Sequence, residues 1–294
     1  MDWLWFSLSS VLLFALANVI DKGLLTHRVK NPYLPVIVDM FLGLIFAGAV
    51  VVLVGISPVS TPAILAMLGL GAIYLGILAS YFKAMQLEEV SRVIPLYNLD
   101  VFFVLVFSIV FLGKIFEFSQ IAGILALLGG GLLISQHDFS KIKFGKAALF
   151  VLVGAIGLSI YFTVSDYLLQ GVDVATFFVY MRMGAFVAAL PLVWIHRRDV
   201  RAMMTQPVKY GLGIIILSES ITVISTFLGS SGIQQSSGAF HSAISAAQPV
   251  FVFLLATGVS IFFPRLLQEE VKGATLLQKG IAILLIFIGV QLLQ

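Results

Sequence analysis

Ionisable side chains lie well inside long apolar segments of this 294-residue sequence. The deepest are Asp100, Arg182 and Glu219. A charged side chain at the centre of a bilayer costs about 2.5–3.5 kcal/mol even on the scale derived from insertion experiments. Each of these residues is therefore a candidate for either a functional site or a structural ion pair.

Arg182 and Glu219 lie halfway along consecutive antiparallel segments, and hence at similar depth. One interpretation is a buried ion pair that only settles helix packing. The other places Glu219 in a cavity, where Arg182 keeps it ionised until a substrate or a proton competes. A desolvated carboxyl group suits proton coupling because it can take up and release a proton near neutral pH.

Asp100 follows Tyr97 and Asn98, which add hydrogen-bonding groups on nearby helix faces. Lys and Arg are absent from residues 96–111, so a partner for Asp100 must come from another helix or from water. The three residues are interpreted either as part of a central cavity or as an interhelical hydrogen-bond clamp.

A polar stripe is predicted along one face of a later helix, because its members recur at helical spacing. Lipid would not tolerate such a stripe, so it should face protein or a wet cavity. Its histidine is the only one inside an apolar segment, and either a structural or a titrating role is open to it. The members are Gln234, Ser237, His241, Ser245 and Gln248.

Asp21, Asp39 and Asp166 lie nearer to segment ends and are secondary candidates, since carboxylates there can reach water or backbone. No catalytic residue, metal or cofactor is expected, and the sequence has no cysteine. Gly229-Ser-Ser-Gly232, followed by His241, has the form of an intramembrane serine hydrolase motif. Four small residues arise easily by chance, so this remains a remote alternative.

The composition excludes a soluble fold. The sequence is 60% hydrophobic and 11% charged, with a mean hydropathy of +1.10, and a spanning helix needs only about 20 apolar residues. Scattered basic residues exclude nucleic acid as a partner. We expect an all-α integral membrane protein with ten transmembrane helices, near residues 3–24, 34–56, 62–85, 93–112, 118–135, 147–169, 174–195, 210–229, 236–261 and 278–293.

The second five segments resemble the first five. Residues 12–21 match 157–166, residues 80–84 match 225–229, and the Gln120 to Gly131 spacing recurs from Gln278 to Gly289. Residues 1–140 and 141–294 are therefore predicted to be two five-helix repeats. Because each repeat has an odd number of helices, the copies must be inverted in the membrane. Inverted repeats are typical of secondary transporters that work by alternating access.

Thirteen basic residues lie in the connectors that follow the first, third, fifth, seventh and ninth predicted helices. The positive-inside rule places these connectors in the cytoplasm. The opposite set of loops holds only Lys114. This predicts both termini outside, in a plasma or inner cell membrane. The thirteen residues are Arg28, Lys30, Arg92, Lys141, Lys143, Lys146, Arg197, Arg198, Arg201, Lys209, Arg265, Lys272 and Lys279.

The stretches 81–95, 100–114, 120–123 and 129–135, with Ala247-Gln-Pro249 in the second half, resemble the EamA family of the drug/metabolite transporter (DMT) superfamily. The resemblance implies ten helices, a central cavity shared by helices 1–4 and 6–9, and peripheral helices 5 and 10. Lys114 departs from the family, which usually has Glu there. Family members also mostly keep both termini in the cytoplasm, opposite to the charge bias.

We expect a multi-pass secondary transporter of a small organic metabolite or drug-like solute, working as an exporter and coupled to protons. Two acidic groups and one basic group at mid-depth favour a cationic or zwitterionic substrate. A channel or a non-transporting membrane chaperone is the main alternative. The run Gly129-Gly-Gly131 permits close helix approach, either at a homodimer face or against helix 4.

Overall fold

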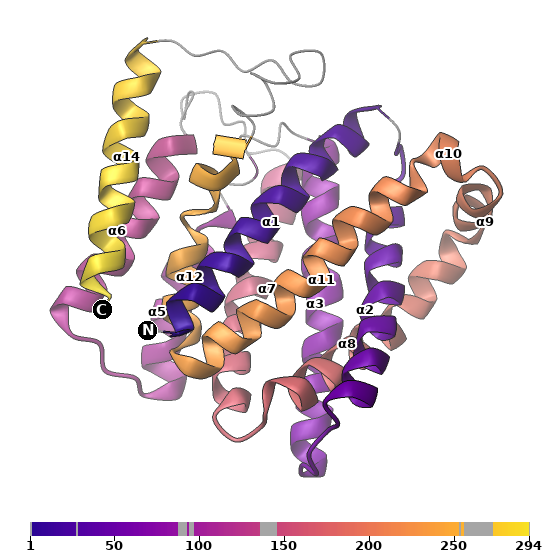
Figure 1. Cartoon of the computed structure of the whole chain (residues 1–294), viewed down its shortest axis with the longest axis horizontal. Coiled ribbons are helices and arrows are strands. Elements are labelled where there is room, and N and C mark those ends of the chain that lie inside the picture. The colour runs from indigo at the N-terminus through magenta and orange to yellow at the C-terminus, as the bar shows by residue number, and fades with distance from the viewer. Residues whose placement is uncertain are drawn as a thin grey trace.

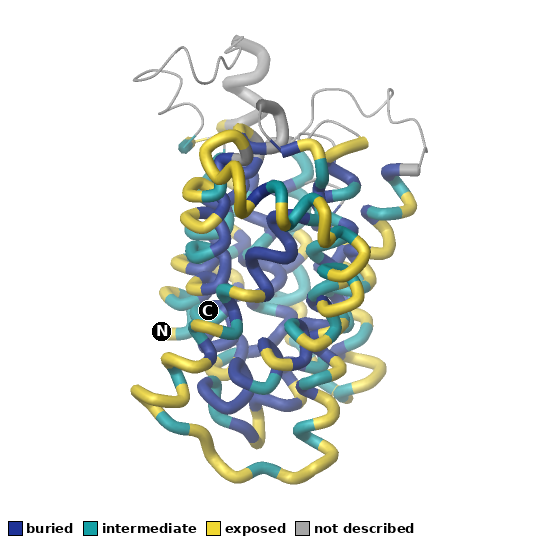
Figure 2. The backbone as a smooth tube through the Cα atoms, turned by 90° about the vertical axis from the view of Figure 1, so that its right-hand side faces the viewer, coloured by how far each residue is buried: buried dark blue, intermediate teal, exposed yellow. Residues whose placement is uncertain are grey.

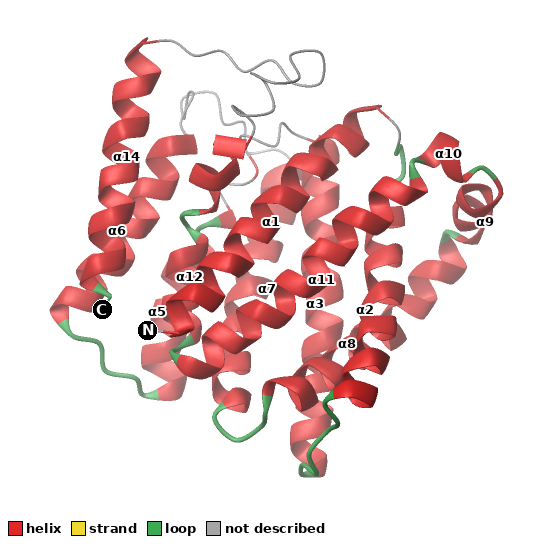
Figure 3. Cartoon of the chain, in the orientation of Figure 1, coloured by secondary structure: helices red, strands yellow, loops and turns green. Residues whose placement is uncertain are grey.

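The computed structural model describes residues 2–27, 29–87, 93, 97–135, 146–252, 254–255 and 273–293. In that part of the chain all regular structure is helical (Figure 3). The twelve helices are α1 (Asp2–His27), α2 (Tyr33–Leu53), α3 (Thr61–Leu87), α5 (Asp100–Leu112), α6 (Phe118–Ser135), α7 (Lys146–Leu169), α8 (Val174–Ile195), α9 (Arg197–Thr205), α10 (Pro207–Tyr210), α11 (Leu212–Gln235), α12 (Gly238–Ser245) and α14 (Gly273–Leu292).

Six of these helices (α1, α2, α3, α7, α8 and α11) are long and apolar enough to cross a membrane, and parts of α5, α6 and α14 form shorter apolar helices. The protein is therefore a multi-pass membrane protein. The predicted helices at 118–135 and 174–195 are confirmed to the residue by α6 and α8. The predicted boundary between the repeats, at residues 140 and 141, lies outside the described residues.

Two predicted helices are interrupted. The segment expected as one helix over 93–112 has a turn at residues 98–99, and α5 begins only at Asp100. The segment expected over 236–261 has a turn at 246–247, between α12 and a further helical stretch that starts at 248. Irregular backbone at membrane depth is tolerated where it is buried in protein or lines a cavity. Both breaks are therefore candidates for positions next to a binding site.

Several helix contacts recur when the helices of the two predicted five-helix units are exchanged. α1 packs on α11, and α3 packs on α7, which is the same contact with the two halves exchanged. Likewise α5 packs on α7 and α1 on α12, while α2–α8 and α6–α14 are contacts between equivalent helices. Figure 1 shows α6 and α14 side by side at one edge of the bundle, as the family resemblance implied for helices 5 and 10.

Buried residues run through the middle of the bundle and exposed ones along its outside (Figure 2). Many exposed residues are large and apolar even in the centres of helices, such as Ile45, Val187 and Leu284. A water-soluble protein rarely exposes a continuous apolar surface of this kind. The outer surface is therefore suited to contact with lipid.

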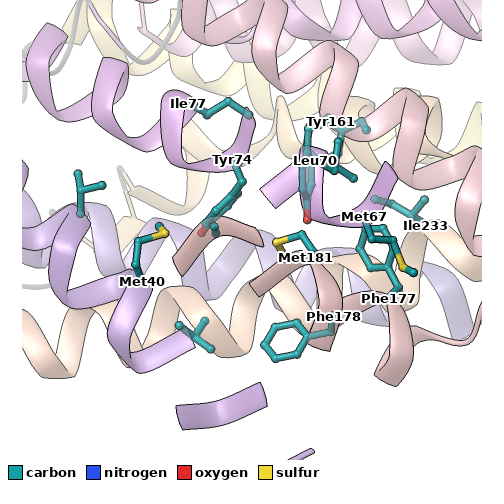
Figure 4. Close-up of a cluster of buried hydrophobic side chains, with 14 of the residues drawn as sticks. Met40, Met67, Leu70, Tyr74, Ile77, Tyr161, Phe177, Phe178, Met181 and Ile233 are labelled. Atoms are coloured by element: carbon teal, nitrogen blue, oxygen red, sulfur yellow. The ribbon is translucent and has the colours of Figure 1, made fainter. Parts of the chain in front are cut away.

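The largest core cluster among the described residues takes most of its members from α2, α3, α7 and α8. Figure 4 shows sulfur-containing and aromatic side chains packed there, including Met40, Met67 and Phe177. Two glycines let the helices approach closely. A Cβ atom added to Gly71 of α3 would clash with the Met181 carbonyl oxygen, and one added to Gly184 of α8 would clash with the Leu68 carbonyl oxygen. Small residues at such crossings drive helix association in membranes.

Gly71→Ala should lower the thermal unfolding midpoint of the detergent-solubilised protein, because the new methyl group meets backbone atoms of α8. Overpacking of this kind costs about 1–3 kcal/mol. Gly69→Ala on the same helix is the matched control, since nothing lies within 4 Å of a Cβ atom at that position. It should leave the midpoint unchanged or raise it. Equal midpoints for the two variants would contradict a tight α3–α8 crossing.

Two of the three glycines in the α6 run pack within the chain, whereas nothing lies within 4 Å of a Cβ atom on Gly129, and a homodimer face stays a prediction. A Cβ atom on Gly130 would meet Ile286 of α14, and one on Gly131 would meet the Ala246 carbonyl oxygen. The expectation of packing against helix 4 named only one neighbour. The contacts of Gly130 and Gly131 also include α14 and the break after α12. Gly131 and Gly289, paired by the repeat spacing, contact different residues, because Gly289 packs on Gly123.

The basic connectors that the structure describes lie at one end of the bundle. Lys30 follows α1, and α9 and α10, which form the connector between α8 and α11, carry Arg197, Arg198, Arg201 and Lys209. Figure 1 places the end of α1 and these two short helices at the top. Arg28, Arg92, Lys141, Lys143, Arg265 and Lys272 lie outside the described residues, as do the side chains of Lys146 and Lys279. The orientation in the membrane stays a prediction.

Asp173 begins α8 as its N-cap and accepts hydrogen bonds from the Thr176 amide and hydroxyl groups. Partial burial raises the pKa of the Asp173 carboxyl, but these hydrogen bonds outweigh it and lower the pKa overall. The Thr176 hydroxyl oxygen also accepts from the Ser57 amide, which ties this cap to the connector between α2 and α3.

Asp173→Ala should destabilise the protein by about 1 kcal/mol at neutral pH, as for other N-cap losses. A lowered pKa means that the carboxylate stabilises the fold above about pH 4 and that this contribution is lost as the pH falls through the folded-state pKa. Thermal unfolding of both proteins at neutral and acidic pH tests this. The difference between their midpoints should shrink at acidic pH; a constant difference would contradict the ionised cap.

Candidate functional site

A cavity of about 160 Å³ lies between the two halves of the chain. Its described lining comes from α1, α3 and the start of α5 in the first half, and from α7, α11, α12 and Gln248 in the second. Those are equivalent helices in the two predicted repeats. For scale, an engineered protein cavity of about 150 Å³ binds benzene. The space therefore suits a small organic molecule.

The described lining differs from the expectation drawn from family resemblance in one respect. α2 and α8, expected to share the cavity, contribute no described lining residue. They form a layer behind it and pack against α3 and α11. Both helix breaks do reach the cavity: Tyr97, Asn98 and Asp100 line it at one break, and Ser245 and Gln248 at the other.

Arg182 pairs with Asp39 rather than with Glu219, which corrects the ion pair considered from the sequence. The Arg182 Nη1 atom donates to Asp39 Oδ2 at 2.8 Å, and both side chains are fully buried. The guanidinium group also lies 4.8 Å from the centre of the Tyr74 ring and 5.4 Å from that of Phe178. The sequence placed both residues inside apolar segments, but it did not show that they are neighbours. Neither Arg182 nor Asp39 lines the cavity.

Glu219 and Asp21 line the cavity side by side in the packed pair α11 and α1. The Ser218 hydroxyl donates to Asp21 Oδ1 at 2.7 Å, and Glu219 follows it in the chain. Glu219 is only 1% exposed, and its Oε1 atom accepts no hydrogen bond. A buried carboxyl oxygen without a partner costs free energy. A group that binds in the cavity could satisfy it.

Asp100 lies at the cavity and also joins two helices. Its Oδ2 atom accepts from the Ser242 hydroxyl of α12 at 2.8 Å, and the Ser159 hydroxyl of α7 donates to its backbone carbonyl. Both interpretations of this residue thus have support in the geometry. Tyr97 donates to Ser80 at 3.3 Å, and the Asn98 amide nitrogen is buried without a hydrogen-bond partner.

The predicted polar stripe is only partly present, because the helix that carries it starts later than expected. Gln234 lies at the exposed end of α11 and donates to backbone carbonyls at the end of α7. Ser237 is the N-cap of α12 and accepts from the Phe240 amide. His241, Ser245 and Gln248 do line the cavity.

His241 pairs with Ser7 of α1, through its Nδ1 atom at 3.0 Å from the Ser7 hydroxyl oxygen. The motif Gly229-Ser-Ser-Gly232 lies inside α11 rather than in the connector where it was expected. Its two serines donate to backbone carbonyls one turn earlier, at Thr226 and Phe227. In the described structure, the two serines of the motif thus bond to backbone, whereas His241 bonds to Ser7.

Asp166, a secondary candidate, forms an ion pair outside the cavity. Lys114 of the α5–α6 loop lies 2.6 Å from its Oδ2 atom, and the Gly238 amide at the start of α12 donates to the same oxygen at 2.9 Å. Lys114, which departs from the family pattern, therefore has a structural partner. The three groups fasten α7, α12 and the α5–α6 loop together at the end opposite the basic connectors.

Aromatic residues form a large part of the cavity wall, and the sequence reasoning missed most of them. Tyr74 and Tyr161 face each other with ring centres 5.8 Å apart, and Tyr81 donates to Asn18 at 2.8 Å. Tyrosine is enriched at membrane interfaces. Tyr74 and Tyr161 instead lie near the middle of their helices, and that position was the signal that could have identified them.

Comparison with known proteins agrees with this architecture. Residues 1–136 match the model of the EamA-like transporter family, which confirms the resemblance predicted from the sequence. One solved crystal structure of a protein is 17% identical in sequence, with a TM-score of 0.70 over 98% of this chain and 94% of the other. At that identity the likeness shows a shared fold alone. A search of the curated proteins returned no match.

Proposed function

From the match of residues 1–136 to the EamA-like transporter family, we propose that this chain is a secondary transporter of a small organic solute. The observation that carries the proposal is the cavity, which takes its lining from equivalent helices of both halves and from both helix breaks. Transporters with inverted repeats bind their substrates at such positions. Ten helices in two inverted five-helix repeats, at residues 1–140 and 141–294, would alternate access to the cavity.

The proposal includes export and proton coupling. Glu219 is the coupling group, since it is buried at the cavity and Arg182 is occupied by Asp39. A carboxyl group in that position can exchange a proton with the cavity. The excess of basic residues in alternate loops supports a plasma or inner membrane location with both termini outside.

Counterflow in proteoliposomes tests the transporter class. Vesicles that hold the protein and are loaded with an excess of unlabelled substrate should transiently accumulate labelled substrate against its gradient. Only a carrier exchanges label in this way, whereas a channel lets it equilibrate. Substrates for the assay come from a metabolite-tolerance screen of a transporter-deficient strain with and without the chain. Equilibration without overshoot would favour the channel alternative, which no feature of the cavity specifically supports.

A further inference from the structure

We propose that the cavity binds a small aromatic amine as its ammonium cation, with Asp21 and Glu219 as the anionic groups that select it. This deepens the proposed function, because it names the chemical class of substrate for the same cavity. Four features carry it: the charge of the lining, the position of Arg182, the unpartnered oxygen of Glu219 and the aromatic wall.

The lining is acidic. Among the described residues that line the cavity there are three carboxyl groups, those of Asp21, Asp100 and Glu219, and no lysine or arginine. Asp100 is held by the Ser242 hydroxyl and lies at the first helix break. Asp21 and Glu219 together form the more acidic end, on α1 and α11. Because no lysine or arginine lies among the described lining residues, a cation bound there would offset the negative charge of these groups.

Arg182 would be the natural counter-ion for Glu219, but Asp39 occupies it. The pair is 2.8 Å apart and fully buried, and the guanidinium group lies 4.8 Å from the centre of the Tyr74 ring. With its charge balanced by Asp39, Arg182 leaves the carboxylates of Asp21 and Glu219 free for a ligand. Asp39 thus acts as a positioning residue that keeps the cavity acidic.

Glu219 provides an independent indication of a ligand. Its Oε1 atom is buried and accepts no hydrogen bond, although the neighbouring Asp21 is held by Ser218. An ammonium group has three donors and no acceptor, which matches carboxylates that need donors. A carboxylate ligand would meet the opposite situation, because no described cation lines the cavity.

Aromatic rings complete the site. Tyr74 and Tyr161 line it with ring centres 5.8 Å apart, and Tyr81 and Tyr97 pack edge to face at 5.7 Å. Ring faces attract cations within about 6 Å and also pack against an apolar ring. The volume of about 160 Å³ limits the ligand to roughly one ring. An aromatic amine with one ring satisfies both requirements.

Calorimetric titration of the purified full-length protein at neutral pH tests the proposal with four probes of the same skeleton. They are 2-phenylethylammonium, the zwitterion phenylalanine, the anion 3-phenylpropionate and the neutral 2-phenylethanol. We expect the ammonium probe to bind about tenfold or more tightly than any of the others. Equal or tighter binding of another probe, or no binding of the ammonium probe, overturns the proposal.

The variants Glu219→Gln and Asp21→Asn should each weaken ammonium binding by about tenfold, as expected when one charge of a desolvated pair is removed. Glu117→Gln is the matched control, an exposed carboxyl group in the α5–α6 loop, and should bind like the wild type. Unchanged unfolding midpoints show that the variants fold. Wild-type affinity in folded Glu219→Gln overturns the assignment.

Counterflow separates the two proposals. If the protein binds the ammonium probe but shows no counterflow, the proposed cation site stands and the proposed transporter function is overturned. Counterflow of an anionic or neutral solute in a protein that does not bind the ammonium probe retains the transporter and overturns the cation site.

Discussion

Asp39→Asn should destabilise the folded protein by about 3–5 kcal/mol, the loss found when one partner of a buried ion pair is removed. Arg182 would keep its charge, because a guanidinium group does not deprotonate in proteins. Its surroundings are fully buried, and its Nε and Nη2 atoms already lack hydrogen-bond partners. The thermal unfolding midpoint and the monodispersity of the purified variant in detergent measure the loss.

A double variant tests whether the loss of stability comes from the unpaired charge of Arg182 or from a change in packing volume. Asp39→Leu with Arg182→Met replaces the pair by apolar groups, which is often neutral or stabilising in other proteins. It should recover most of the stability that Asp39→Asn loses. If Asp39→Asn unfolds at the wild-type temperature, the buried pair described at 2.8 Å does not hold Arg182 in solution.

Glu219→Gln should abolish the response of transport to a pH gradient, because glutamine keeps the shape of the side chain and cannot exchange a proton. A pH gradient of either sign across the proteoliposome should no longer drive substrate accumulation. Counterflow at saturating substrate should persist, since the remaining lining, including Asp21 and the aromatic wall, is intact. The measurement is uptake of labelled substrate with and without the gradient.

Glu117→Gln again serves as the control, because the same substitution is made at an exposed carboxyl group outside the cavity. Its response to the gradient should equal that of the wild type. Full pH-driven accumulation by Glu219→Gln would eliminate this residue as the coupling group and move the search to Asp21 and Asp100, the other carboxyl groups that line the cavity.

The sequence predicted which residues are candidates better than it predicted their partners. Asp100, Glu219, His241 and Gln248 do line one cavity, together with Tyr97, Asn98 and Asp21. Each was identified because a polar group in an apolar segment has few tolerable positions. Arg182, Asp39 and Asp166 are also polar groups in apolar segments, but they form ion pairs outside the cavity.

The helix breaks were not predicted. The residues around positions 98 and 246 are compatible with a continuous helix by composition, and Pro249 was the only local signal in the second segment. The breaks are stabilised by contacts from elsewhere in the chain. A Cβ atom on Gly131 of α6 would clash with the Ala246 carbonyl oxygen and lie 3.2 Å from Asn98. Such contacts between distant segments carry no local sequence signature.

By itself, the sequence determined the membrane class, the positions of most helices and which polar groups lie inside apolar segments. Apolar length and helical rise are local properties, and both can be read along the chain. The tertiary structure alone decided that Arg182 pairs with Asp39, that Glu219 is left to the cavity, and that Tyr74 and Tyr161 form its wall. The reason is physical: lipid and protein core are equally apolar, so hydrophobicity does not show which face of a membrane helix meets which neighbour.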